Sequence, residues 1–222
     1  MNTAQRPLAG IGMTSQRTRA RMIERLREQG IRNEKVLAAM AAVPRHVFVE
    51  EALASRAYED TALPLGMGQT ISQPYVVARM IEVLLTGRSG LGKTLEVGAG
   101  CGYQASVLAQ LTKEVYAVER LKPLLEKAKL NMRQLQQFNV RLKLADGHFG
   151  LPEAAPFDSI IVAAAASHIP QALLQQLAPG GRLILPVGAG EQYLSLIEHT
   201  MQGFTETRLD AVRFVPLLPG TE

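Results

Sequence analysis

The chain of 222 residues is 47% hydrophobic and 20% charged, a composition that excludes an intrinsically disordered protein. Its single cysteine, Cys101, excludes a disulfide framework and a zinc site built from cysteines. The formal net charge of +4 is concentrated in residues 1–35, which hold eight basic and three acidic side chains. The longest apolar run, residues 160–166, is too short to span a membrane, and the first ten residues lack the apolar stretch of a secretory signal. We therefore expect a cytoplasmic protein.

The first 90 residues are predicted to be mainly helical, after a loose leader over residues 1–13. Apolar spacing and stop signals place helices over residues 15–29, 34–42, 50–57 and 73–85. Met22, Ile23 and Leu26 share one face of the first helix, and Asn33 is a suitable N-cap for the second. The glycines at positions 66 and 68 mark a turned loop before the last of these helices.

After residue 92, strand-like and helical patterns alternate. Strands are expected over residues 94–97, 115–119, 140–145, 158–164 and 182–187, and helices over 103–111, 122–137 and 170–177. This alternation predicts an α/β fold with a doubly wound, mostly parallel sheet. Two further runs, 193–198 and 204–215, have no helix between them and should form an antiparallel hairpin at one sheet edge. We expect one domain over residues 14–222, with a helical cap and substrate loop (14–90) and a cofactor-binding core (91–222).

A glycine loop joins the first core strand to the next helix. Gly98, Gly100 and Gly102 form a G-x-G-x-G pattern, which differs from the G-x-G-x-x-G dinucleotide fingerprint, and no G-K-[ST] of a P-loop is present. Glycines let a backbone approach a ligand closely. In an open α/β sheet, such a turn lies beside the crevice where ligands bind.

Acidic residues follow the next two strands. Glu119 lies 21 residues after Gly98, where a carboxylate accepts the ribose hydroxyls of a nucleoside. Asp146 and Gly147 end the third strand, where an adenine would lie. A glycine loop with two acidic turns and no phosphate-binding cation favours S-adenosylmethionine. The structural alternatives are a tight turn for the glycines, a surface acid for Glu119 and a helix N-cap for Asp146.

The region after the fourth strand bears on the substrate. Residues 163–168 contain neither the Asn/Asp-Pro-Pro-aromatic motif of amino-methylating nucleic-acid enzymes nor a cysteine nucleophile for base-carbon methylation. We therefore expect no nucleic-acid partner. The basic N-terminal helix still leaves an RNA methyltransferase open as an alternative. A non-catalytic regulator that binds S-adenosylmethionine is another.

Three further segments carry a resemblance to a known family: VPRHVFV (43–49), GMGQTISQP (66–74) and VRFVPL (212–217). Over residues 15–218 the chain resembles the protein-L-isoaspartate O-methyltransferases. The resemblance implies a Rossmann-like methyltransferase fold and a cytoplasmic repair enzyme. Such an enzyme methylates the free α-carboxylate of L-isoaspartyl residues in damaged proteins and peptides, and repair proceeds through a succinimide. It further implies S-adenosylmethionine as cofactor, S-adenosylhomocysteine as product, no metal, no membrane partner and a monomer.

The resemblance also implies site residues. Ser72 is the expected catalytic residue, and Thr70, Ser72 and Arg213 are expected to meet the substrate. The expected cofactor-binding residues are Gln69, Thr70, Ile71, Glu96, Gly98, Gly100, Gly102, Glu119, Asp146 and Gly147. Because an α-carboxylate is already ionised at pH 7, no general base is required, and Ser72 should position the substrate by hydrogen bonding. The alternatives are a helix N-cap for Ser72 and a solvent-facing position on an edge strand for Arg213.

The chain departs from the family pattern at three places. Glu50 replaces a proline, Ala166 and Ser167 replace two prolines, and Cys101 replaces a serine or threonine. The second departure leaves the peptide preference open. For Cys101 we expect a small, semi-buried thiol. The alternative is a reactive thiol, with a pKa lowered by the N-terminus of the following helix.

Overall fold

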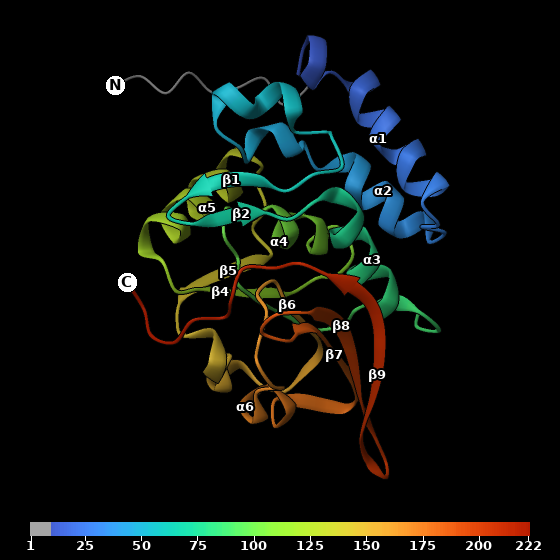
Figure 1. The fold of residues 1–222 in the computed structure, drawn as a ribbon, viewed down its shortest axis with the longest axis vertical. Coiled ribbons are helices and arrows are strands. Elements are labelled where there is room, and N and C mark those ends of the chain that lie inside the picture. The colour runs from blue at the N-terminus through green and yellow to red at the C-terminus, as the bar shows by residue number, and fades with distance from the viewer. Residues whose placement is uncertain (1–9) are drawn as a thin grey trace.

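The structure is a computed structural model that describes residues 10–222. A seven-stranded sheet forms its centre, and the N-terminal helices gather in the upper part of the view in Figure 1, above the long strands β7 to β9. Most of the expected leader, residues 1–9, lies outside the described residues, and Gly12–Thr14 forms a short 3-10 helix. No helix within residues 10–222 is long and apolar enough to cross a membrane.

The first two helices form as their sequences predict. Helix α1 (Gln16–Glu28) begins after Ser15, whose hydroxyl accepts a hydrogen bond from the amide of Thr18, and it buries Met22, Ile23 and Leu26. Helix α2 (Glu34–Ala42) begins after Asn33, whose side chain accepts from two first-turn amides. The next segment forms two 3-10 helices, Arg45–Val47 and Glu51–Arg56. The second of them takes the place of the helix expected over 50–57.

A small hairpin that the sequence did not predict precedes the next helix. Strands β1 (Leu63–Gly66) and β2 (Gln69–Ile71) pair antiparallel. Their turn places Gly66, Met67 and Gly68 at positive φ, a region that glycine adopts at little cost. Helix α3 (Pro74–Leu85) follows, with Pro74 in its first turn, where the missing proline N–H costs no hydrogen bond.

The large sheet has the order β5-β4-β3-β6-β7-β8-β9. Its strands are β3 (Thr94–Val97), β4 (Val115–Glu119), β5 (Val140–Leu144), β6 (Phe157–Val162), β7 (Leu177–Val187), β8 (Gln192–Thr200) and β9 (Gly203–Val212). The first five strands of that order pair in parallel, whereas β7, β8 and β9 pair antiparallel. The predicted parallel core and antiparallel edge hairpin are both confirmed.

Helices α4 (Tyr103–Leu108), α5 (Lys122–Gln134) and α6 (Gln171–Leu174) connect the parallel strands. Two 3-10 helices, Gly147–Phe149 and Pro152–Ala154, follow β5. Helix α6 is shorter than the expected 170–177, because Leu177 already pairs with Phe157 as the first residue of β7. One cluster of buried side chains includes Met22 of α1, Met80 of α3 and Ile184 of β7, so the helical layer and the sheet share a core.

The last ten residues cross the carboxyl ends of three strands, and we call residues 213–222 the C-terminal segment. Val215 and Leu217 exchange backbone hydrogen bonds with Ala165, just after β6. The amide of Gly220 then donates to Asp146, after β5, and Glu222 pairs with the backbone after β4. In Figure 1 this segment runs across the front of the sheet from β9 towards the C-terminus.

Candidate functional site

The glycine loop follows β3, which has β4 on one side and β6 on the other. From β3 the chain continues to β4 and β5 on one side of the sheet, and it then crosses to β6 and β7 on the other side. Gly98 and Gly100 have φ values of +87° and +54°, which disfavour any residue with a Cβ atom. A Cβ on Gly102 would lie 2.6 Å from Cε of Met132. Gly102 is therefore required for packing against α5, and it is not among the residues that line the cavity beside this loop. Its expected role in cofactor binding stays a prediction.

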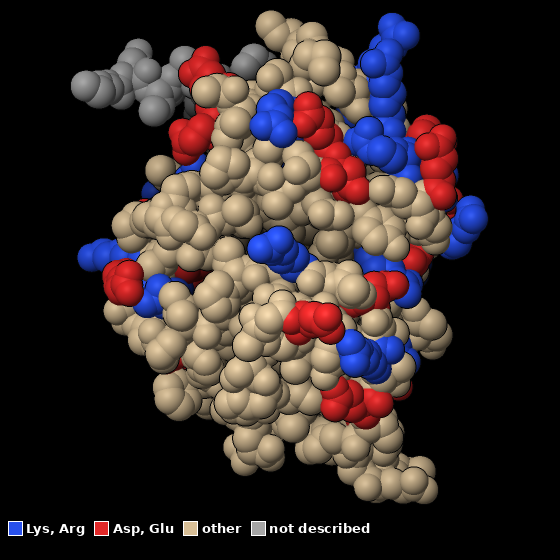
Figure 2. All heavy atoms as spheres, viewed as in Figure 1, with Lys and Arg blue, Asp and Glu red and all other residues tan. Residues whose placement is uncertain are grey.

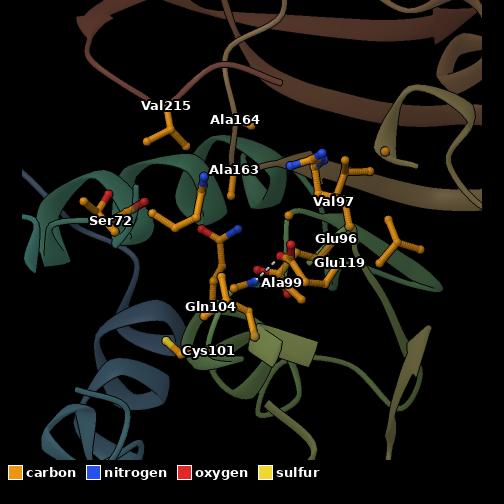
Figure 3. A pocket seen from close by; sticks show the side chains of 18 of the residues that line it. Ser72, Glu96, Val97, Ala99, Cys101, Gln104, Glu119, Ala163, Ala164 and Val215 are labelled. Atoms are coloured by element: carbon orange, nitrogen blue, oxygen red, sulfur yellow. Dashed lines mark hydrogen bonds between the residues drawn. The ribbon is translucent and has the colours of Figure 1, made fainter. Parts of the chain in front are cut away.

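The first cavity extends from this loop to the β1–β2 hairpin, at the carboxyl ends of β3, β4 and β6. Nine of the predicted residues line it: Gln69, Thr70, Ile71, Ser72, Glu96, Gly98, Gly100, Glu119 and Gly147. A Cβ on Gly147 would lie 2.5 Å from Val97 and 3.1 Å from Leu217, so only glycine fits at this point of the wall. In Figure 3, Glu96, Glu119 and Gln104 lie on one side of this cavity and Ser72 on the other.

A second cavity lies between the start of α3 and the end of β9. Its lining includes Tyr75 and Arg79 of α3 and Arg213 of the C-terminal segment. Four residues line both cavities: Thr70, Ser72, Ala163 and Val215. The two cavities therefore meet at Ser72, which makes this residue the junction between the predicted cofactor space and a second cavity.

Glu119 is held in place by the glycine loop. Its Oε2 accepts a hydrogen bond of 2.8 Å from the amide of Gly100, and its Oε1 accepts one of 2.9 Å from the amide of Leu121. The first of these bonds joins the two strand ends that the sequence singled out. Each carboxylate oxygen can accept a further hydrogen bond, so Glu119 can still receive the hydroxyls of a ribose.

Glu96 is the most unusual group in the first cavity. It is 0% exposed, and neither carboxylate oxygen has a hydrogen-bond partner among the described residues. Burial raises the pKa of Glu96 well above its usual value; the amide of Gln104 offsets part of the rise, and the Glu119 carboxylate adds to it. The Nε2 atom of Gln104 is also unpartnered. The Gln104 amide lies near enough to favour the ionised form of Glu96 but completes no hydrogen bond with it. Because a buried carboxylate short of hydrogen bonds is costly, Glu96 indicates a ligand that can donate hydrogen bonds to it.

Asp146 does not line the first cavity, although it was expected to contact the cofactor. Its Oδ1 accepts from the amide of His148, at 2.9 Å, and its Oδ2 accepts from the amide of Gly220, at 2.6 Å. Burial alone would raise the pKa of Asp146, but the hydrogen bonds from Gly220 and His148 outweigh it and hold the pKa below its usual value. Asp146 is thus the N-cap of the 3-10 helix Gly147–Phe149, and its second oxygen anchors the C-terminal segment. Its expected contact with the cofactor stays a prediction.

Ser72 is not the N-cap of α3, so that alternative is wrong. Gln73 occupies the N-cap position, and its side chain makes no capping hydrogen bond. The amide of Tyr75 in the first turn donates to Oδ1 of Asp60 instead, at 2.8 Å. The Ser72 hydroxyl, half-buried where the two cavities meet, makes no hydrogen bond to any described residue.

Arg213 is exposed and lines the second cavity. Arg79 of the same cavity forms an ion pair with Asp210, at 2.9 Å, whereas no carboxylate within residues 10–222 pairs with Arg213. The second cavity, which Ser72 also lines, therefore carries one uncompensated positive charge. Such a charge attracts an anionic substrate group without strongly desolvating it.

Cys101 is buried, and the reactive alternative is wrong for it. Burial raises the pKa of the Cys101 thiol to about 11. The carbonyl of Cys101 accepts a hydrogen bond from Asn131, at 2.9 Å, which fixes the glycine loop against α5. A thiol with this pKa is almost entirely protonated at neutral pH and is a poor nucleophile.

The basic helix α1 is largely occupied by contacts within the chain. Arg19 donates to Tyr58 and to the carbonyl of Ala41, Arg25 donates to the carbonyl of Tyr58, and Arg27 pairs with two glutamates. Figure 2 shows acidic side chains between the basic ones on this face, rather than one continuous basic patch. The surface therefore offers little support for the RNA alternative. Among residues 10–222, no group of three or more potential metal ligands is gathered at one place.

Several cavity residues were missed by the sequence analysis. Gln104 lies two residues beyond Gly102, the last glycine of the loop, so its position in the first turn of α4 was the available signal. Val215 and Pro216 belong to a segment that was noted only as a motif. Ala163 lines both cavities because it follows β6 directly, a place that the expected strand over 158–164 had assigned to the sheet.

Comparisons with known proteins show the family to which the chain is similar. The sequence model of the family described as protein-L-isoaspartate(D-aspartate) O-methyltransferase matches residues 17–222. A protein-L-isoaspartate O-methyltransferase of Dechloromonas aromatica is 87% identical over 215 residues, 97% of this chain and 100% of that protein. One from Azoarcus sp. is 68% identical over 206 residues, 93% of this chain and 95% of that protein.

A solved structure is similar as well. It is described as a protein-L-isoaspartate O-methyltransferase from Plasmodium falciparum in complex with S-adenosyl-L-homocysteine. It superposes with a TM-score of 0.77 at 28% identity, over 90% of this chain and 98% of that one.

Proposed function

Because the chain belongs to the protein-L-isoaspartate(D-aspartate) O-methyltransferase family, we propose specific roles for the residues that line its two cavities. The enzyme transfers a methyl group from S-adenosylmethionine to the free α-carboxylate of L-isoaspartyl residues in damaged proteins and peptides. The resulting ester starts repair through a succinimide. The first cavity takes the cofactor, and the second takes the peptide around the damaged residue.

The residues of the first cavity fit this cofactor. S-adenosylmethionine supplies an electrophilic methyl group on a sulfonium and carries an ammonium at its amino-acid end. Glu96 is buried and lacks a partner, so it suits a cationic ligand, and the unpartnered amide of Gln104 suits a carboxylate. Glu119 remains able to accept ribose hydroxyls. Gln69, Thr70 and Ile71 of β2 form part of the wall towards the substrate.

Ser72 has a positioning role at the junction of the two cavities. The α-carboxylate of the substrate is ionised at pH 7, so it needs no base to become a nucleophile. The Ser72 hydroxyl is unpartnered among residues 10–222 and can donate to one carboxylate oxygen, leaving the other free to attack. Holding reactants in line is worth about 7–11 kcal/mol in favourable cases, and the apolar side chains of Ala163 and Val215 exclude water from the same place.

The observation that carries these assignments is that Ser72 lines both cavities, opposite the buried acid Glu96. Arg213 supports the assignment of the second cavity to the substrate, because it supplies an unpaired positive charge to the lining of that cavity. Gly102 and Asp146 take no part in cofactor contact in this proposal, and both act by packing or anchoring.

The test uses two peptides that differ only in Asp against L-isoAsp, with methyl-labelled S-adenosylmethionine. Base-labile label on the isoaspartyl peptide alone is the expected result. Equal labelling of both peptides, or label that resists base, would contradict carboxyl methylation of isoaspartate. Omission of S-adenosylmethionine and addition of S-adenosylhomocysteine as inhibitor are the controls.

We also propose that the monomer is the active unit. The described residues of one chain complete both cavities without a second copy. Light scattering during size exclusion, at the enzyme concentration of the assay, tests this proposal. A cytoplasmic location is proposed from the family and from the single buried cysteine, which needs no oxidising compartment.

A further inference from the structure

Arg45 is the largest fully buried side chain of the described residues, with 0% of its surface exposed. It begins the 3-10 helix Arg45–Val47 and lines neither cavity. No carboxylate within residues 10–222 forms an ion pair with it. Burying a cation without a counter-ion costs free energy. The hydrogen bonds that Arg45 makes therefore indicate its structural role.

The guanidinium of Arg45 joins three separate parts of the chain. Its Nε donates to the carbonyl of Ala57, at 2.8 Å, and its Nη2 donates to the carbonyl of Ser72, at 2.7 Å. Its central carbon lies 4.7 Å from the centre of the Tyr103 ring, at the start of α4, and this ring lines the first cavity. Nη1 has no partner among the described residues.

This arrangement fixes the backbone of Ser72 through a side chain that lines neither cavity. Ser72 precedes Gln73 and Pro74, and it has no regular helix or strand hydrogen bond of its own. On its other side, the first turn of α3 is held by Asp60 through the amide of Tyr75. Ala57 and Asp60 belong to one loop, so the same loop supports the chain on both sides of Ser72.

We infer that Arg45 is a positioning residue for methyl transfer, which acts through the Ser72 carbonyl and sets the direction of the Ser72 hydroxyl. The inference rests on the proposed role of Ser72. A planar guanidinium can donate to two carbonyls in different directions while stacking on a ring, and an ammonium cannot. The charge alone is therefore insufficient at this position.

The test compares Arg45→Lys with a matched control, Arg25→Met. Arg25 lies in the same helical layer, is half-buried and donates to the carbonyl of Tyr58, one residue after Ala57, but does not contact Ser72. For the Arg45 variant we expect kcat with the isoaspartyl peptide to fall by about 10- to 100-fold. The Kd of S-adenosylhomocysteine, measured by calorimetry, should stay within about threefold. The Arg25 variant should lose thermal stability and keep its kcat per folded molecule.

A double-mutant cycle with Ser72→Ala separates positioning from a general structural role. If Arg45 acts through Ser72, the double variant should have a kcat within about twofold of the slower single variant, because the hydroxyl to be positioned is already gone. Independent, multiplying losses would overturn the inference. A fall in the Arg45→Lys rate that only follows its unfolded fraction would overturn it too. Inactive wild-type enzyme would instead contradict the proposed function, so the two failures are distinguishable.

If Arg45→Lys does not fold, Arg45→Gln provides the second variant. Its amide keeps one donor for the Ser72 carbonyl and removes the charge. A third variant, Arg45→Met, lacks both the charge and the donor and serves as the reference. The inference predicts that kcat of Arg45→Gln lies between the values of Arg45→Met and the wild type, because one hydrogen bond to the Ser72 carbonyl is kept. Equal rates for Arg45→Gln and Arg45→Met, both folded, would contradict it.

Discussion

Asp146 and Gly220, 74 residues apart in the chain, are joined by a hydrogen bond of 2.6 Å from the Gly220 amide to the Asp146 carboxylate. This bond fastens the C-terminal segment beside Gly147, whose backbone lines the first cavity. Leu217 and Leu218 of the same segment also line that cavity. The position of this part of the cavity wall therefore depends on a side chain that does not line the cavity.

Asp146→Ala should weaken cofactor binding because it releases this wall. We expect the Kd of S-adenosylhomocysteine to rise by about tenfold, which corresponds to 1.4 kcal/mol and one charge-assisted hydrogen bond. Calorimetry measures the Kd at pH 7. Glu153→Ala, which removes an exposed carboxylate paired with Lys143, is the matched control and should leave the Kd unchanged.

The anchor at Asp146 should also depend on pH. The lowered pKa of Asp146 in the folded protein means that its contribution to stability is complete above the unfolded value of about 3.9 and is lost as the pH falls through the folded value. We therefore expect protease cleavage within residues 217–222 to accelerate only in the acidic range. Acceleration between pH 6 and 8 would contradict this assignment.

Glu96→Gln should stabilise the cofactor-free protein and weaken cofactor binding at the same time. The pKa of Glu96 is raised in the fold, so its ionisation makes the folded state less stable as the pH rises from the unfolded value of about 4.3 towards the raised folded value. The variant lacks this decline. We expect its Tm at pH 7 to exceed that of the wild type, and each kcal/mol gained in the free energy of unfolding raises the Tm by about 2–4 °C. We also expect S-adenosylmethionine to bind more weakly. A lowered Tm would contradict the unpartnered state of Glu96.

Ser72→Ala should lower activity with little effect on stability. Because Gln73, and not Ser72, occupies the N-cap of α3, no helix cap is lost. Loss of one hydrogen bond to a charged group predicts a fall in kcat/KM of about 10- to 100-fold. Steady-state kinetics and thermal unfolding are measured together, with Ser72→Thr as the variant that keeps a hydroxyl. Full activity with a lowered Tm would leave Ser72 only a structural role.

Arg213→Gln should raise the KM for the isoaspartyl peptide by about two- to fivefold at low salt, as expected for an exposed charge, and leave kcat nearly unchanged. The effect should shrink as salt screens the charge. Arg208→Gln is the control, because Arg208 is also exposed but stacks on Tyr193, with its guanidinium carbon 4.0 Å from the ring centre. Equal changes in both variants would show that only net charge matters.

Cys101 should resist alkylation in the folded protein. Its buried thiol has a pKa of about 11, so iodoacetamide should label it at the same slow rate with and without cofactor. Labelling should become fast only in denaturant, and the single cysteine makes the mass increase unambiguous. Rapid labelling of the cofactor-free native protein would contradict its burial.

The alternation of strands and helices could be predicted because it depends on local periodicity. Helix α2 and strands β3 and β4 have their expected bounds. The hairpin β1–β2 could not be predicted, since its strands have only four and three residues and the first contains Pro64. Such short strands are set by tertiary contacts more than by propensity.

Site residues could be predicted where the residue type and its position at or after the end of a strand were enough to place it in the site. Glu96, Gly98 and Glu119 line the first cavity as expected. The packing of Gly102 against Met132, 30 residues away, could not be inferred from the loop alone. The hydrogen bond of Asp146 with Gly220 could not be predicted either, since Gly220 follows it by 74 residues.

The first cavity is lined by segments that range from Leu65 to Leu218. Bringing such distant segments together requires closure of several long loops, and the entropy of each closure is recovered only when the contacts form. The complete lining therefore requires the segments from Leu65 to Leu218 to be folded together. Activity should therefore be lost in the same cooperative transition as the fold. A partly folded or cleaved molecule should be inactive and not merely slower, so the total activity of a sample should be proportional to its number of intact molecules.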